Sequence, residues 1–267
     1  MLLREVEYAR PTSLDQALQL LGASDGARAL AGGQTLVNVM KARAASPDVL
    51  VDLGKLDELR TIAVSERGLE LGAMVTYSQL IRDEQVRAAR PILADVCAQI
   101  ADVQVRNRGT VGGNVCSNDP TNHLPPLLCA LGASMTIVGP GGGRTVPAEE
   151  FFLGVYMTAV GLGELLTQIT IPPGGRDGFA SVTIGADGTC IVNAAANLDG
   201  EPVVAVGCVS AVPVVVRPSS TDESPLRESV RGAVTDPPGD VHASSEYRRH
   251  LAEVVAVRAV RQASERS

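Results

Sequence analysis

The segment that most constrains the fold is RNRGTVGGNVCSNDPTNHLPP, from Arg106 to Pro126. It is rich in glycine, asparagine and proline, and Val111, Val115 and Leu124 stand isolated within it. Because no helical or strand period is visible, the composition predicts a loop of roughly twenty residues. A loop of that length is unusual inside a compact domain unless it has a task. The sequence therefore points to a long, glycine-rich segment beside a binding site.

Charge and hydropathy exclude several classes of protein. With 45% hydrophobic residues, the 267-residue chain suffices for one large or two modest domains. The 23 basic and 30 acidic residues give a net charge of −7, which argues against nucleic acid as a partner. No apolar run approaches the ~18 residues of a membrane span, and MLLREVEYARP is not a secretory signal. We therefore expect a cytoplasmic protein without a membrane span.

The cysteines indicate neither a disulfide framework nor a metal site. The five cysteines lie far apart in the sequence and include no C-x-x-C pair: Cys97, Cys116, Cys129, Cys190 and Cys208. Such spacing is typical of reduced, mostly buried thiols in a cytosolic protein. It also excludes an iron–sulfur cluster or zinc site built from local cysteines, so we expect no metal ligated by this chain.

Periodicity divides the chain near residue 173. Before that point, helices alternate with short strands, and S-x-x-Q and T-x-x-Q capping boxes at Ser13 and Thr76 begin two of the helices. After Gly174, β-type runs are separated by the hairpin signals ADG and LDG. The stretch from Arg217 to Gly239 is polar and lacks a period. A closing amphipathic helix is predicted to bury Tyr247, Leu251, Val254 and Val255.

Two glycine pairs follow apolar stretches, in ALAGGQTL (29–36) and GTVGGNV (109–115). A strand that ends in such a turn and leads into a helix presents backbone N–H groups on one side, and these groups bind anions. Two neighbouring nests would suit a pyrophosphate. Taken singly, each pair is more often a plain turn. Neither segment matches G-x-G-x-x-G or G-x-x-x-x-G-K-[ST], so the Rossmann and P-loop fingerprints are missing.

Four segments carry a family resemblance: AGGQTL, QVRNRGTVGGNVCSNDPTNHLPPLL, ELLTQITIP and SSEYRRHLAEV. In order and spacing they resemble the FAD-binding medium subunit of the molybdenum hydroxylases, the family of carbon monoxide dehydrogenase and xanthine dehydrogenase. The resemblance covers nearly the whole chain. It implies an α+β fold: a vanillyl-alcohol-oxidase-type FAD-binding domain (1–173, subdomains about 1–55 and 56–173) and a smaller C-terminal α+β domain of the CO dehydrogenase flavoprotein type (174–267).

The resemblance also implies which residues contact a non-covalent FAD. The two glycine segments would cradle the pyrophosphate, and two further residues match positions that pack against the isoalloxazine ring, although by sequence alone both would be ordinary core. His123 stands where relatives usually carry an aspartate, and it could pair with a phosphate or a ribityl oxygen or lie exposed on the loop. The implied cofactor-binding residues are Ala29, Leu30, Ala31, Gly32, Gly33, Gln34, Thr35, Leu36, Ile100, Thr110, Val111, Gly112, Gly113, Asn114, His123 and Leu166.

The function implied by the resemblance is electron transfer rather than substrate hydroxylation. A large molybdopterin subunit and a small subunit with two-iron iron–sulfur clusters would be the partners, in a dimer of heterotrimers. FAD on this chain would receive electrons and pass them to an external acceptor. No catalytic residue is assigned, because no Ser/His/Asp set or carboxylate pair stands at a recognisable spacing. Two alternatives remain open: a stand-alone flavin oxidase, and a non-enzymatic assembly module.

Overall fold

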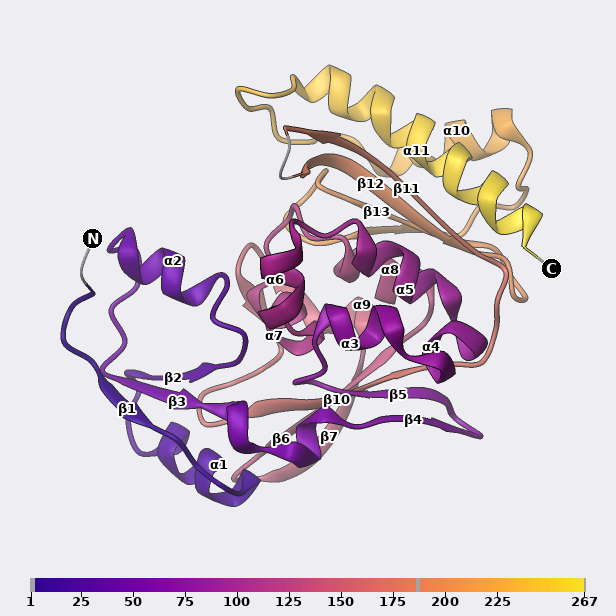
Figure 1. The fold of residues 1–267 in the computed structure, drawn as a ribbon. Helices are drawn as coiled ribbons and strands as arrows, with labels where there is room; N and C mark the ends of the chain where they lie inside the picture. Colours follow the sequence, from indigo (N-terminus) through magenta and orange to yellow (C-terminus); the bar gives the residue numbers. More distant parts are fainter. Residues whose placement is uncertain (1–2, 186–187, 267) are drawn as a thin grey trace.

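The structure, a computed structural model, describes residues 3–185 and 188–266. Helices and strands alternate along the chain and form a three-stranded, a five-stranded and a four-stranded sheet, together with a two-stranded hairpin. Figure 1 shows the three-stranded sheet at one end, and a layer of helices between the five-stranded and the four-stranded sheets. Among the described residues, no helix combines the length and apolarity that a bilayer crossing requires.

The N-terminal sheet is parallel, with the strand order β1-β3-β2. Ser13 begins the first helix as expected, since its side chain accepts a hydrogen bond from the amide of Gln16. Helix α2 starts directly after the glycine turn that follows β2, so this turn lies at the carboxyl end of a parallel strand. The elements are β1 (Glu7–Ala9), α1 (Leu14–Gly22), β2 (Ala27–Leu30), α2 (Leu36–Lys41), β3 (Val49–Asp52) and the 3₁₀ helices η1 (Leu53–Lys55) and η2 (Asp57–Arg60).

The central sheet is antiparallel, in the order β4-β5-β10-β6-β7, and β10 joins the two hairpins. The predicted capping box at Thr76 is present, because Gln79 bonds back to the Thr76 backbone. The elements are β4 (Ile62–Ser65), β5 (Gly68–Gly72), α3 (Tyr77–Arg82), α4 (Glu84–Ala89), α5 (Pro91–Ala98), α6 (Val103–Arg108), α7 (Val111–Ser117), α8 (Leu124–Ala130), β6 (Ser134–Gly139), β7 (Gly142–Pro147), α9 (Ala148–Phe151), β8 (Phe152–Gly154), β9 (Met157–Thr158) and β10 (Leu165–Ile171).

The prediction of a long loop from Arg106 to Pro126 is wrong. The segment contains the end of α6, the whole of α7 and the start of α8. Val111 and Val115 stand four residues apart on one helix face, and both are buried in the central core together with Leu124. Glycine lowers helix propensity, but burial of this apolar face against the core outweighs that cost in so short a helix.

The C-terminal sheet is antiparallel, in the order β11-β12-β13-β14, and the turn LDG joins β12 to β13 as expected. Helix α8 contacts one face of β12 and β13, and α11 covers the other face (Figure 1). In the other predicted hairpin turn, residues 186 and 187 lie outside the described residues. The elements are β11 (Asp177–Ile184), β12 (Thr189–Asn197), β13 (Val203–Gly207), β14 (Val214–Val216), α10 (Glu223–Ala233) and α11 (Ser245–Glu265).

In this C-terminal region, periodicity does not reveal one helix, and the predicted burial of one side chain is wrong. The stretch from 217 to 239 contains the helix α10, which buries Leu226 and Val230 against α11. In α11, Tyr247 is 48% exposed instead of lying on the buried face. The helix packs on the sheet mainly through alanines and valines, so the face of α11 that is buried lies away from Tyr247.

Helix α11 also approaches the backbone of β11 closely at Gly178, where an added Cβ would lie 1.9 Å from the Ala259 carbonyl oxygen.

A buried ion pair joins the helical layer to the C-terminal sheet. Arg90, at the junction of α4 and α5, places Nε 2.8 Å from Oδ2 of Asp177 at the start of β11. Its Nη1 donates to the Pro172 carbonyl at 3.0 Å. Burial raises the pKa of Asp177, and the neighbouring Arg90 charge opposes that shift. Arg90 therefore contacts both Pro172 and Asp177, which lie on either side of the change in periodicity near residue 173.

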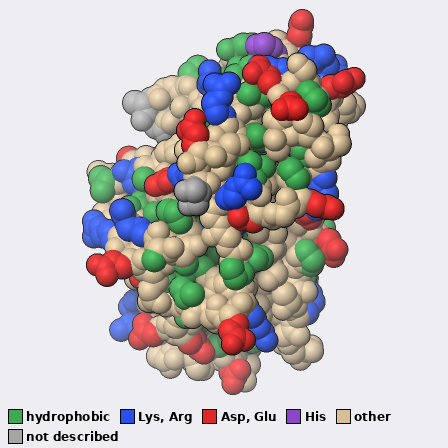
Figure 2. All heavy atoms as spheres, turned by 90° about the vertical axis from the view of Figure 1, so that its right-hand side faces the viewer, with side chains coloured by type: hydrophobic (Ala, Val, Ile, Leu, Met, Phe, Trp, Pro, Cys, Tyr) green, Lys and Arg blue, Asp and Glu red, His purple; other side chains and the backbone are tan. Residues whose placement is uncertain are grey.

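On the face drawn in Figure 2, acidic and basic side chains are mixed. Figure 2 shows one face on which described lysines, arginines and carboxylates are interspersed with apolar side chains, and no basic side chains gather into a patch there. This distribution agrees with the net charge of −7 and gives no footprint for a nucleic-acid backbone on this face.

Candidate functional site

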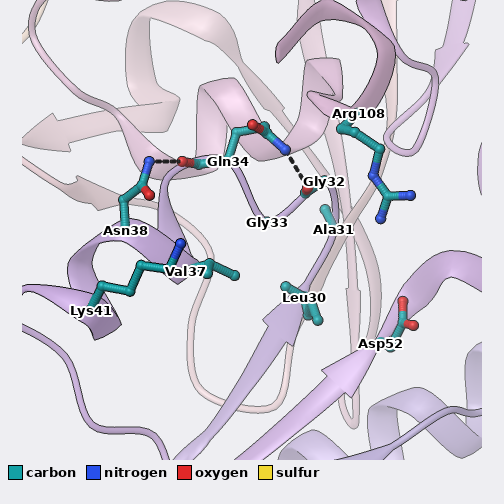
Figure 3. Close-up of a pocket in the computed structure, with 10 residues that line it drawn as sticks. All are labelled: Leu30, Ala31, Gly32, Gly33, Gln34, Val37, Asn38, Lys41, Asp52 and Arg108. Carbon is teal, nitrogen blue, oxygen red and sulfur yellow. Dashed lines mark hydrogen bonds between the residues drawn. The ribbon is translucent and has the colours of Figure 1, made fainter. Parts of the chain in front are cut away.

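A cavity of about 340 Å³ opens where β2 ends and α2 begins. Figure 3 shows the glycine turn at its centre, with Lys41 and Arg108 approaching from opposite sides. A cavity of this size lies at the lower end of the range for small-molecule sites. The lining residues are Leu30, Ala31, Gly32, Gly33, Gln34, Val37, Asn38, Lys41, Asp52 and Arg108.

The glycine turn satisfies its own carbonyl groups but leaves its amides free. The Gly32 carbonyl accepts from the Gln34 side chain at 3.1 Å, and the Gly33 carbonyl accepts from the Val37 amide at 3.2 Å. The Gln34 carbonyl accepts from the Asn38 side chain at 2.8 Å. By contrast, the amides of Gly32, Gly33, Gln34 and Thr35 donate to no group of the described residues. Four consecutive free donors form a nest for an anion.

Glycine is required at both positions of the turn, for different reasons. Gly33 has φ +73°, in the left-handed region that side-chain-bearing residues avoid. At Gly32, an added Cβ would lie 2.1 Å from the Arg108 carbonyl oxygen. The turn therefore rests directly on the backbone that joins α6 to α7, which brings the two glycine segments together in space.

Two cations, Lys41 and Arg108, line the cavity beside this nest. Lys41 lies in the last turn of α2, and Arg108 ends α6. Neither takes part in an ion pair within the described ranges. The nearby carboxylate of Asp52 is engaged elsewhere, with the Tyr8 hydroxyl, the Gly54 amide and Arg10. The cavity thus combines free amide donors with uncompensated positive charge, which favours an anionic ligand.

The second glycine segment is a supporting structure in this geometry. The amides of Val111 and Gly112 donate to the Val75 and Ala73 carbonyls, both at 2.9 Å. The Gly113 amide donates to Oγ1 of Thr110 at 3.0 Å, as in an N-cap. An added Cβ at Gly112 would lie 2.6 Å from the Ala73 backbone oxygen, so this glycine permits close packing of α7. The amides predicted to form a second nest are therefore already satisfied within the protein.

The predicted site residues divide into two groups. Five line the cavity: Leu30, Ala31, Gly32, Gly33 and Gln34. Eleven do not: Ala29, Thr35, Leu36, Ile100, Thr110, Val111, Gly112, Gly113, Asn114, His123 and Leu166. The sequence analysis missed Val37, Asn38, Lys41, Asp52 and Arg108 as lining residues. A signal was available, since Arg108 lies within the RNRG motif and Lys41 stands four residues after Val37 on a helix.

Several of the predicted residues that do not line the cavity are buried. His123 is 5% exposed, which excludes a loop histidine on the surface, and its ring lies 5.2 Å from that of Phe179. Leu166 is buried in the central core, and Ile100 packs against the same core with partial exposure. Asn114 is also buried, and its Oδ1 lacks a hydrogen-bond partner in the described part of the chain.

Comparison with known proteins shows the family and the fold. Residues 4–174 match the model for the FAD binding domain in molybdopterin dehydrogenase. The carbon monoxide dehydrogenase medium chain of Afipia carboxidovorans is 35% identical over 98% of this chain and 97% of that protein. The glyceraldehyde dehydrogenase medium chain of Sulfolobus acidocaldarius is 32% identical over 97% of this chain and 98% of that protein.

A solved structure shows the same fold at full length. Reconstituted CO dehydrogenase from Oligotropha carboxidovorans contains a chain that superposes with a TM-score of 0.93 at 33% identity, covering 100% of both chains. The family match and these relatives define a flavin-binding oxidoreductase chain of mixed helices and sheets. The protein belongs to the family of FAD-binding medium subunits of molybdopterin dehydrogenases, as the sequence resemblance predicts.

Proposed function

We propose that this chain is the FAD-binding electron-transfer subunit of a molybdenum hydroxylase complex. The observation that carries the proposal is the nest of free amides from Gly32 to Thr35, flanked by Lys41 and Arg108. These groups fit a pyrophosphate, whose adjacent phosphates need several donors and a compensating charge. Bound there, FAD supplies a redox centre that accepts electrons from one partner and gives them to another.

The roles of this chain's own residues follow from the cavity. The amides of the glycine turn would hold one phosphate, and the two cations would neutralise the remaining charge. Thr110 to Asn114 would support the site indirectly, because their packing holds the α6–α7 junction against Gly32. Leu30, Ala31 and Val37 offer the aliphatic wall of the cavity. Binding is proposed to be non-covalent, since neither histidine nor cysteine lines this cavity.

The sheets support a division of the chain at the boundaries expected from sequence. The parallel sheet takes strands only from residues 7–52, and the central sheet only from residues 62–171. The antiparallel sheet with α10 and α11 spans residues 177–265. We assign the first two to the subdomains 1–55 and 56–173 of a vanillyl-alcohol-oxidase-type FAD domain, and the third to a C-terminal domain, 174–267.

The proposed partners are a large molybdopterin subunit and a small iron–sulfur subunit, as the names of medium chains in related dehydrogenases suggest. We propose a dimer of heterotrimers in the cytoplasm that passes electrons to an external acceptor. Affinity purification of the tagged chain from its native host should recover both partners. Recovery of the chain alone, with turnover of an organic substrate, would instead favour a stand-alone flavin oxidase.

FAD binding is tested with two matched glycine variants. Gly33 and Gly132 both have positive φ, +73° and +64°, but only Gly33 lines the cavity. Valine at either site carries similar backbone strain, on the order of 1–3 kcal/mol. Gly33→Val should weaken FAD binding at least ~10-fold in a fluorescence titration, because the turn changes shape. Gly132→Val should keep the wild-type dissociation constant. Equal affinities in both variants and the wild type would place FAD elsewhere.

A further inference from the structure

A buried cluster of two cysteines, a histidine and an asparagine lies between α8 and the C-terminal sheet, outside the FAD cavity. Nδ2 of Asn193 lies 3.4 Å from Sγ of Cys190 and 3.8 Å from Sγ of Cys208. The same nitrogen lies 3.5 Å from Nδ1 of His123, the residue before α8. Cys190 and Cys208 are only 3% and 4% exposed. All four side chains therefore meet around one amide group in a nearly closed site.

Irregular backbone brings the two cysteines together. The register between β11 and β12 shifts between Val182 and Thr183, so that Val182 pairs with Val192 and Thr183 pairs with Cys190. Such a bulge turns the side chain beyond it to the other face of the sheet, which puts Cys190 on the side of Asn193. Cys208 follows the end of β13 with φ +66°. Positive φ is uncommon for a residue other than glycine and marks local strain.

The charges around the cluster distinguish the two thiols. Hydrogen bonding from Cys208 and the nearby ring of His123 lower the pKa of Cys190, against the effect of burial. For Cys208, hydrogen bonding to Cys190 and burial raise the pKa, Asp119 adds to this rise, and Arg248 opposes it. Elsewhere, burial raises the pKa values of three other cysteines to about 12: Cys97, Cys116 and Cys129.

We propose that Cys190 and Cys208 form an oxidation-sensitive dithiol that closes to a disulfide between β12 and the end of β13. Cys190 is the nucleophile, because its thiolate is stabilised, and Cys208 is the resolving thiol. The small exposed fractions select a small oxidant, for which hydrogen peroxide is the chemical class. The inference does not depend on FAD binding.

The chemistry balances in two steps. The Cys190 thiolate attacks one peroxide oxygen, a sulfur–oxygen bond forms, the oxygen–oxygen bond breaks, and hydroxide leaves and takes up a proton as water. Cys208 then attacks the sulfur of the Cys190 sulfenic acid. The sulfur–sulfur bond forms, the sulfur–oxygen bond breaks, and the leaving hydroxide takes the Cys208 proton as a second water. In total, two thiols and one peroxide give one disulfide and two waters.

The test compares all five cysteines in the full-length wild-type chain. The protein is exposed to hydrogen peroxide for increasing times, denatured in N-ethylmaleimide, digested and analysed by mass spectrometry. We expect a peptide that links Cys190 to Cys208, formed at least ~10-fold faster than oxidation of the three raised-pKa cysteines. Dithiothreitol should restore both thiols. Loss of all five thiols at one rate, or a disulfide to any other cysteine, would overturn the proposal.

Two single variants test the assigned roles, each checked for a cooperative thermal transition. In Cys208→Ala, Cys190 should continue to the sulfinic acid, because no second thiol resolves the sulfenic acid. In Cys190→Ala, Cys208 should react with peroxide as slowly as Cys97 does. His123→Asn should slow the loss of Cys190 about 10-fold if the imidazole stabilises the thiolate. Rapid oxidation of Cys208 in the absence of Cys190 would contradict the order of attack.

Discussion

Replacing the two cations of the cavity tests whether it binds a pyrophosphate. Lys41 and Arg108 face the glycine turn from opposite sides and make no ion pair within the described residues (Figure 3). A charge-assisted hydrogen bond is worth about 1.5–3 kcal/mol, but both side chains are exposed and screened by solvent. We therefore expect a loss of about 1 kcal/mol in FAD binding for Lys41→Met or Arg108→Met, which is roughly a 5-fold rise in the dissociation constant.

The two losses should roughly add in the double variant, since the cations belong to different elements and approach the phosphates from opposite sides. A loss of about 2 kcal/mol corresponds to roughly a 30-fold rise in the dissociation constant, measured by quenching of flavin fluorescence. The wild type should also lose affinity as salt rises, and the double variant much less. Lys55→Met, which removes an exposed lysine outside the cavity, is the matched control. A double variant that binds within twofold of wild type would refute the assignment of the phosphate site.

Three further predictions concern stability. Gly112→Val should lower the free energy of unfolding by about 1–3 kcal/mol in urea titration, because its side chain meets the Ala73 backbone; a wild-type midpoint would contradict this packing. Arg90→Met should cost about 3–5 kcal/mol by the same assay, since it leaves the Asp177 carboxylate buried without its cation; a loss below ~1 kcal/mol would be incompatible with that pairing. Hydrogen bonding from Arg231 lowers the pKa of Glu253 in the folded protein. The contribution of Glu253 to the free energy of unfolding is therefore fully present above the unfolded pKa and is lost as pH falls through the lower folded pKa. Glu253→Gln should therefore be less stable than wild type at pH 7, with a difference in thermal midpoint that shrinks on acidification below the unfolded pKa of ~4.3; a difference independent of pH would argue against this linkage.

The sequence predicts much of the local structure because that information is local. The capping residues Ser13 and Thr76 begin their helices where expected. The strand before Gly32 and the turn LDG are also present as predicted. Each of these features depends on a few neighbouring residues, through hydrogen bonds or a period of two.

The prediction fails where packing between distant segments overrides local preference. Glycine and asparagine around residue 112 favour a loop, yet burial of Val111 and Val115 in the central core stabilises a helix. Helix α10 is polar along most of its length and forms because Leu226 and Val230 meet α11. Neither contact is visible in a short window of sequence.

The candidate site also combines features that follow from local sequence with features that depend on packing between distant segments. By itself, the sequence identifies the FAD-binding family and the first glycine turn, because the motifs that carry the resemblance, AGGQTL among them, are continuous in the chain. Tertiary structure alone decides which amides are free. The turn at Gly33 keeps its donors available, whereas at Gly112 the Ala73 carbonyl accepts the donor. It also places Arg108, from a segment 76 residues after Gly32, beside the first turn. The physical reason is that hydrogen-bond satisfaction and charge pairing depend on which segments meet in space, and that is decided by the packing of the whole chain.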